Sequence, residues 1–148
     1  MSDADVWFSA PSQRQGGLQL ICFHHAGGNT SFFRRWGHCL PNENEPLYVN
    51  YPGRGARYLD PGSTQIDPFV SDLVAASDRR VRVPYALFGY SLGGILAYEF
   101  ARKMAAMGRP PAHLVVGAVK APHLFQTRLS DRSDEELIRK LISCGGTQ

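Results

Sequence analysis

Residues 85–94 read YALFGYSLGG, and this stretch decides how the rest of the chain is interpreted. The apolar run from Tyr85 to Phe88 predicts a buried strand, and glycines crowd the turn that follows it. Beyond the turn, apolar side chains recur at four-residue steps, which predicts an amphipathic helix that ends near Gly108. The sequence thus places Ser91 at the tip of a sharp turn between a strand and a helix. The helical set is Leu92, Leu96, Phe100 and Met104.

Residues 89–93 also fit the pattern G-x-S-x-G. A serine in so sharp a turn has a strained backbone, and its neighbours two positions away must be small because strand and helix pass closely there. Gly89 and Gly93 meet that need. The turn would raise the hydroxyl above the carboxyl edge of the sheet and direct the positive end of the helix at it. Ser91 is therefore a candidate nucleophile; the alternative is an ordinary tight turn, which the flanking strand and helix disfavour.

A second glycine-rich loop, residues 24–30, directly follows the apolar run 18–23. Backbone amides of such a loop, together with the amide after the serine, can bind the oxyanion formed in acyl transfer. A phosphate-binding loop is disfavoured because the G-x-x-x-x-G-K-[ST] frame is missing. Metal binding by His24 and His25 is disfavoured because adjacent histidines on a strand point apart and no carboxylate is near. We therefore expect no metal and no cofactor.

The remaining pattern alternates strands with helices. Apolar runs at 18–23, 47–51, 85–88 and 114–119 predict strands, and 6–8 can add an edge strand. Helical patterns begin at Thr30 or Ser31, at Asp67 ahead of Pro68, at Leu92 and at Ser133. This alternation predicts the α/β class, with a mainly parallel sheet and helices on both faces. No linker or repeat interrupts it, so residues 1–148 are expected to form a single unit.

Composition excludes several classes of function. The 148 residues carry a net charge of +3, with 43% hydrophobic and 20% charged residues, an ordinary globular balance. The basic residues are scattered, which argues against nucleic-acid binding. Three cysteines without C-x-x-C spacing suggest neither disulfides nor a zinc site. We see no signal core and no apolar run near the ~20 residues of a membrane span, so a cytoplasmic location without a membrane partner is expected.

With these motifs in view, the chain resembles the type II thioesterases of non-ribosomal peptide and polyketide biosynthesis, which have the α/β-hydrolase fold. The Pro52-Gly53-Arg54 loop favours this family over generic esterases. The resemblance implies that Ser91 is the nucleophile and that Ala26 and Leu92 supply the oxyanion amides. It also implies hydrolysis of acyl thioesters on the phosphopantetheine arm of an acyl or peptidyl carrier protein, as an editing step in antibiotic biosynthesis. The matching stretches are residues 23–28, 51–57, 88–94 and 121–123; Tyr90 replaces the histidine common before the serine.

In that family the catalytic Asp and His follow the lid helices. The resemblance assigns about 1–125 to the core and about 126–148 to the start of a lid, with a helix at 133–144. It thus implies a partial α/β-hydrolase fold, truncated at its C-terminus, in which the catalytic Asp and His are not present. We expect such a chain to be weakly active or inactive.

Other histidines and carboxylates are poor substitutes for that pair. His24 and His25 are expected to shape the oxyanion loop, and His113 to lie at the wrong edge of the sheet. His123, Asp131 and Asp134 are interpreted as structural, loop or cap residues. Two alternatives remain open: a small-molecule esterase of the same fold, and a non-catalytic remnant.

Overall fold

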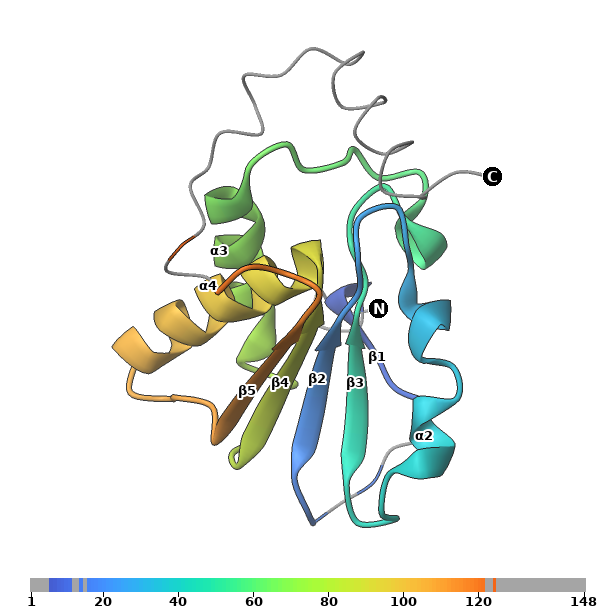
Figure 1. Cartoon of the computed structure of the whole chain (residues 1–148), viewed down its shortest axis with the longest axis vertical. Helices are drawn as coiled ribbons and strands as arrows, with labels where there is room; N and C mark the ends of the chain where they lie inside the picture. The colour runs from blue at the N-terminus through green and yellow to red at the C-terminus, as the bar shows by residue number, and fades with distance from the viewer. Residues whose placement is uncertain (1–5, 12–13, 15, 122–123, 125–148) are drawn as a thin grey trace.

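A five-stranded sheet forms the centre of the computed structural model, which describes residues 6–11, 14, 16–121 and 124 (Figure 1). The strands stand in the order β1-β3-β2-β4-β5. β1 runs antiparallel to β3, and the other neighbouring pairs are parallel, which confirms the predicted mainly parallel sheet. The bounds are β1 (Phe8–Ser9), β2 (Gln19–Phe23), β3 (Glu45–Val49), β4 (Tyr85–Tyr90) and β5 (His113–Gly117).

Alternation along the strands divides the core between the two faces of the sheet. Ile21 is paired in register with Leu47 and Leu87, and all three are fully buried among the residues of α3 (Ile66–Ser77) and α4 (Leu92–Ala106). One residue further on, Cys22 is paired with Tyr48 and Phe88 in a separate apolar cluster. That cluster also contains Phe33 and Trp36, from η1 (Thr30–Phe33) and α2 (Trp36–Cys39). Helical segments therefore cover both faces, as predicted.

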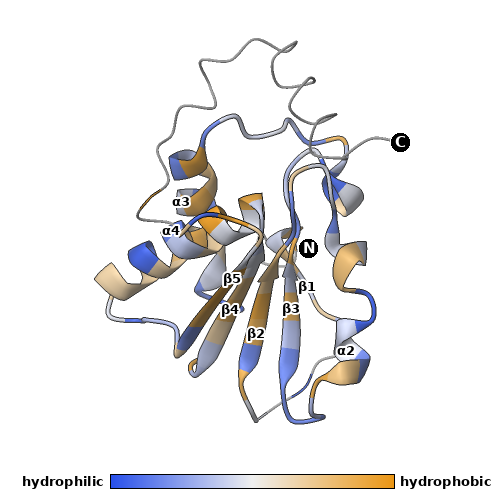
Figure 2. Cartoon of the chain, in the orientation of Figure 1, coloured by the Kyte–Doolittle hydropathy of each residue, from blue (hydrophilic) through white to orange (hydrophobic). Residues whose placement is uncertain are grey.

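Hydropathy also changes along the strands. Figure 2 shows β2 and β5 hydrophilic at their amino ends and hydrophobic beyond them, toward the side of the sheet where α4 begins. These two strands thus carry their apolar residues toward the edge at which the loops after β2, β3 and β4 gather (Figure 1). In parallel sheets this edge is where ligands bind.

The segment 30–40 differs from the single helix expected there. Asn29, and not Thr30 or Ser31, is the cap, because its side chain accepts a hydrogen bond from the amide of Ser31 at 2.8 Å. The helix then divides into η1 and α2. The hydroxyl of Tyr48 donates to the carbonyl of Phe33 at 3.1 Å, so this carbonyl is bonded to the sheet. A tertiary hydrogen bond thus takes the acceptor that a continuous helix would use.

Smaller corrections concern element ends. α3 begins at Ile66 with Gln65 as its N-cap, so Asp67 lies in the first turn and is not the cap. β3 covers 45–49 in place of 47–51, and the edge strand covers 8–9 in place of 6–8. The expected helix at 133–144 lies outside the described residues. None of the helices in the described part has the length and hydropathy to span a bilayer.

A buried polar cluster ties the amino ends of the strands together. Glu45 is 3% exposed, and its carboxylate accepts hydrogen bonds from the Gln19 amide at 2.7 Å and from the Arg82 guanidinium at 2.6 Å. The Gln19 side-chain oxygen in turn accepts the backbone N–H of Arg82 at 2.6 Å. The cluster fixes β2, β3 and the segment that leads into β4.

We predict that Glu45→Gln lowers the free energy of unfolding by about 2 kcal/mol, because a buried, charged acceptor of two hydrogen bonds is lost. Urea unfolding followed by circular dichroism measures this change. Glu99→Gln is the matched control, since Glu99 pairs only with the exposed Arg102 at 3.4 Å. Its effect should stay within about 0.5 kcal/mol. Equal effects of the two substitutions would contradict the structural role of the cluster.

Candidate active site

Ser91 occupies the turn between β4 and α4 in a conformation that side chains rarely adopt, with φ of 57° and ψ of −120°. Two backbone hydrogen bonds hold this turn. The amide of Ser91 donates to the carbonyl of Gly117 at 2.8 Å, and the carbonyl of Ser91 accepts from the amide of Gly94 at 2.9 Å. The strained turn expected from G-x-S-x-G is therefore present, and it is fixed from β5 as well as from α4.

The glycines on either side of the serine are required by close backbone contacts. A Cβ at Gly89 would overlap the carbonyl oxygen of Gly93. A Cβ at Gly93 would overlap the carbonyl oxygen of Phe23 and lie 2.6 Å from that of His24. The first turn of α4 thus lies directly against the end of β2. This contact brings the serine turn beside the loop that follows β2.

That loop is a tight turn with Ala26 and Gly27 at its exposed tip. The carbonyl of His25 accepts the amide of Gly28 at 3.1 Å, and Gly27 has a φ of 76°, as the third residue of a type II turn requires. Gly28 is needed for a different reason: a Cβ there would lie 2.8 Å from the ring of His25. The glycines therefore let the loop close tightly over the end of β2.

The structure brings Ala26 and Leu92 to one cleft of about 470 Å³. β2 and β4 are neighbours, with Phe23 opposite Gly89, so their following loops start side by side. Leu92 is the first residue of α4, and the amide at that position has no acceptor within the helix. Ser91 directly precedes Leu92 and is partly exposed, although it is not itself among the residues that line the cleft. The loop after β3 and residues 62–66 complete the walls.

His24 also lines this cleft, yet it is only 1% exposed. Its ring stacks on that of Tyr51 with 3.7 Å between centroids, and the Tyr51 hydroxyl donates to the His24 carbonyl at 2.9 Å. Nδ1 lies 2.9 Å from the carbonyl oxygen of His25. Because a carbonyl oxygen only accepts, Nδ1 carries the proton and Nε2 is left as an acceptor. Within the described part of the chain, Nε2 is buried without a hydrogen-bond partner.

The pKa of His24 is lowered from the ordinary value of 6.5 to about 4, mainly because the ring is buried. The hydrogen bond to the His25 carbonyl acts in the opposite direction, and the nearby charges of His25 and Arg54 contribute to the lowering. The ring is therefore uncharged at neutral pH. Burial also raises the pKa of Tyr51 well above its usual value. This neutral, stacked pair of rings was not expected from the sequence, where Tyr51 was interpreted as the end of a strand.

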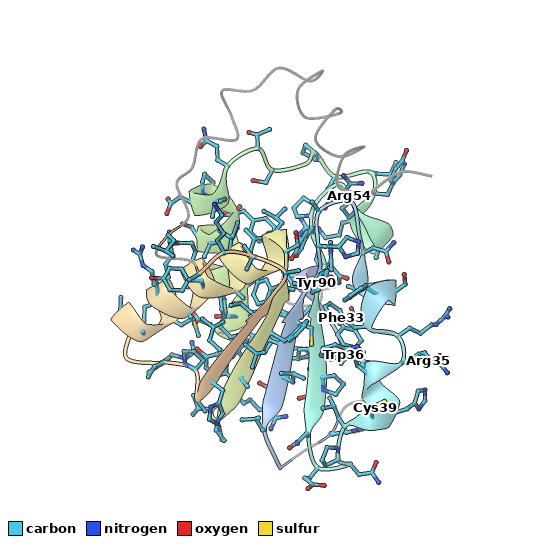
Figure 3. All side chains as sticks on the ribbon, in the orientation of Figure 1. Phe33, Arg35, Trp36, Cys39, Arg54 and Tyr90 are labelled. Atoms are coloured by element: carbon cyan, nitrogen blue, oxygen red, sulfur yellow. The ribbon has the colours of Figure 1, made fainter. Side chains whose placement is uncertain are left out.

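His25 points away from its neighbour, as predicted. Its ring meets those of Phe32 and Tyr90 edge-on, at 5.0 and 6.2 Å between centroids, and these two rings stack on each other (Figure 3 labels Tyr90). His113 begins β5 opposite Ala86, at the far edge of the sheet, as expected.

The serine hydroxyl is not engaged by the side chains around it in the described part of the chain. Among the described residues, no side chain forms a hydrogen bond with the Ser91 hydroxyl. The same residues contain no group of three metal-ligating side chains. His123, Asp131 and Asp134 lie outside the described ranges.

We predict that His24→Phe reduces the loss of stability on acidification. In the wild type the unfolded histidine takes up a proton near pH 6.5 and the folded one only near pH 4, so stability falls as the pH drops through this window. Between about pH 7 and about pH 5 the variant should lose about 2 kcal/mol less than the wild type. Urea unfolding at the two pH values tests this, with His38→Gln as an exposed-histidine control. If His24→Phe and His38→Gln lose the same free energy of unfolding between the two pH values, His24 is not the group whose protonation lowers stability.

Comparisons with known proteins agree with this geometry. A family model described as Thioesterase domain matches residues 18–148. The thioesterase PikA5 of Streptomyces venezuelae is 35% identical over 122 residues, which cover 80% of this chain and 43% of that protein. The linear gramicidin dehydrogenase LgrE of Brevibacillus parabrevis is 29% identical over 145 residues, or 95% of this chain and 55% of that protein. The chain thus spans about half the length of these curated relatives.

Solved structures of thioesterases also superpose on this chain. The type II thioesterase BorB from the borrelidin biosynthetic cluster superposes with a TM-score of 0.83 at 35% identity, covering 97% of this chain and 60% of that one. The RedJ thioesterase from the prodiginine pathway of Streptomyces coelicolor does so with a TM-score of 0.81 at 35% identity, covering 95% and 55%. These matches confirm the resemblance inferred from the motifs: the chain belongs to the thioesterase domain family and has the fold of its type II members.

Proposed function

We propose that the protein hydrolyses acyl thioesters held on the phosphopantetheine arm of a carrier protein, with Ser91 as the nucleophile. The observation that carries this proposal is the strained turn at Ser91, with a φ of 57°, beside the Ala26 loop. Strain of this kind persists only where the surroundings impose it, and it is concentrated at functional sites. The biosynthetic clusters and pathways from which the solved neighbours come support the choice of a carrier-bound substrate.

The chemistry follows from the groups that meet at the cleft. The Ser91 oxygen attacks the thioester carbonyl, the carbon–sulfur bond breaks, and the thiol of the arm leaves with a proton. Water then attacks the acyl-serine and releases the acid. In both steps the negative charge on the carbonyl oxygen is held by the amides of Ala26 and Leu92; one such donor is typically worth about 3 kcal/mol. The N-terminal end of α4 adds a favourable field.

A base must receive the proton of Ser91. The pKa of His24 is lowered to about 4 and its Nδ1 is already bonded to a carbonyl, which makes it a weak candidate. The family resemblance assigns the role to a histidine that comes later in the chains of the family's members, after an aspartate that orients it.

We predict that Ser91→Ala removes covalent labelling by an alkyl fluorophosphonate, measured by intact mass. In a longer form that also contains the catalytic Asp and His implied by the resemblance, this substitution should lower the turnover of acyl thioesters to a residual rate, about a thousandfold above the uncatalysed one, that the oxyanion amides sustain. Ser31→Ala is the control, since Ser31 is an exposed serine in η1, and it should label as the wild type does. Labelling that persists in the Ser91→Ala protein would remove Ser91 from the mechanism.

We further predict a preference for thioesters over oxygen esters. A thioester carbonyl is less stabilised by resonance, so it needs less activation by the enzyme. Rates on acyl-pantetheine and on the p-nitrophenyl ester of the same acyl group should therefore favour the thioester in kcat/KM. Equal or faster cleavage of the p-nitrophenyl ester would favour the small-molecule esterase instead.

A further inference from the structure

The cleft carries one guanidinium that has no acidic partner among the residues that the structure describes. Arg54 lines it from the loop after β3, and its side chain is exposed. Across the described residues, no carboxylate lies within ion-pair distance of Arg54, and none of the residues that line the cleft is acidic. By contrast, Arg57 in the same loop is paired with Asp60 at 2.7 Å and packs over the ring of Trp7 at 4.3 Å. Arg57 therefore stabilises the loop, whereas the guanidinium of Arg54 forms no ion pair among the described residues and is available to a ligand.

The backbone around Arg54 is firmly held, although its side chain forms no hydrogen bond or ion pair within the described part of the chain. The amide of Arg54 donates to the carbonyl of Tyr51 at 3.2 Å, and the carbonyl of Arg54 accepts from the amide of Arg57 at 2.8 Å. Gly53 has a φ of 75° and lies close against Gly62, in the segment that forms the opposite wall. The position of the charge at the cleft is thus set by the fold. Figure 3 shows Arg54 beyond the carboxyl ends of the strands, far from Arg35, the N-cap residue of α2.

Other groups reinforce the positive potential. α3 and α4 both begin at the cleft, with Ile66 and Leu92, and Gln65 caps α3 without a side-chain hydrogen bond. Two positive helix ends therefore face the same space as Arg54. His24 also lines the cleft but adds no charge, since it is neutral. Asp67, in the first turn of α3, is engaged with Lys103 at 2.7 Å. A cleft with one sign of charge concentrates ligands of the opposite sign.

We propose that Arg54 binds an anionic group of the substrate in this cleft. The inference rests on the proposed function, because a carrier-bound thioester offers two sources of such a group: the phosphate of the phosphopantetheine arm, and a free carboxylate on the acyl chain. A guanidinium suits either, since its planar N–H donors match paired oxygens. Arg54 is then a specificity-determining residue, and the neutral parts of the substrate are bound without it.

The test measures binding, so it does not depend on turnover. In a Ser91→Ala background, which prevents acyl transfer, isothermal titration calorimetry compares two matched pairs of ligands. The first pair is 4′-phosphopantetheine and pantetheine, and the second is succinyl-pantetheine and butyryl-pantetheine. We expect one anionic ligand to bind about tenfold more tightly than its neutral partner, and Arg54→Gln to abolish that difference. The pair that shows the effect identifies the source of the charge.

Two further variants test whether the preference depends on the position of the charge and on the planar guanidinium. Arg35→Gln removes the same charge from α2, away from the cleft, and should keep the preference. Arg54→Lys keeps the charge without the planar fork and should retain part of it. If neither anionic ligand is preferred, or if Arg54→Gln weakens the neutral and anionic ligands equally, the proposal is wrong. If the preference is present but a longer form that contains the implied catalytic Asp and His cleaves no thioester, the proposed function alone is refuted.

Discussion

The site depends on one contact between backbones. At Gly93 the first turn of α4 lies so close to the end of β2 that a single added carbon would overlap the carbonyl oxygen of Phe23. This approach fixes the helix relative to the sheet, and the turn at Ser91 must take its strained conformation to enter the helix from β4. The same approach sets the spacing between Leu92 and the loop at Ala26. The arrangement of the cleft is thus a consequence of how closely α4 and β2 can pass.

Interactions on both sides of the sheet keep that contact in place. On one face, Phe100 of α4 packs against Phe23 at the end of β2, with 5.8 Å between ring centroids. On the other face, Phe33 and Trp36 cover Phe88 of β4. At the opposite edge of the sheet, the buried carboxylate of Glu45 joins the starts of the same strands. β2 and β4 are therefore held at both ends and on both faces, and their following loops inherit that rigidity.

Local signals were enough to predict the features whose causes are local. The glycines around Ser91, the four-residue apolar repeat of α4 and the stop at Gly108 all act within a few residues, and the structure has them as expected. The division of the segment 30–40 was not predictable in this way, because its cause is the Tyr48 hydroxyl on a later strand. Long-range pairings were missed for the same reason. Tyr51 donates to a carbonyl 27 residues away, and Arg82 reaches a carboxylate 37 residues away.

The hydrogen bond from the Ser91 amide to the carbonyl of Gly117 has a consequence for local dynamics. Gly117 is the last residue of β5, which is the outermost strand of the sheet on that side within the described ranges, and His113 and Val115 on this strand are exposed. Strands at an edge open locally at a lower free energy than central ones. Because the serine turn is anchored to this strand, separation of β5 from β4 would also remove the hydrogen bond of the Ser91 amide. The persistence of the strained turn is therefore limited by how firmly β5 stays attached to β4.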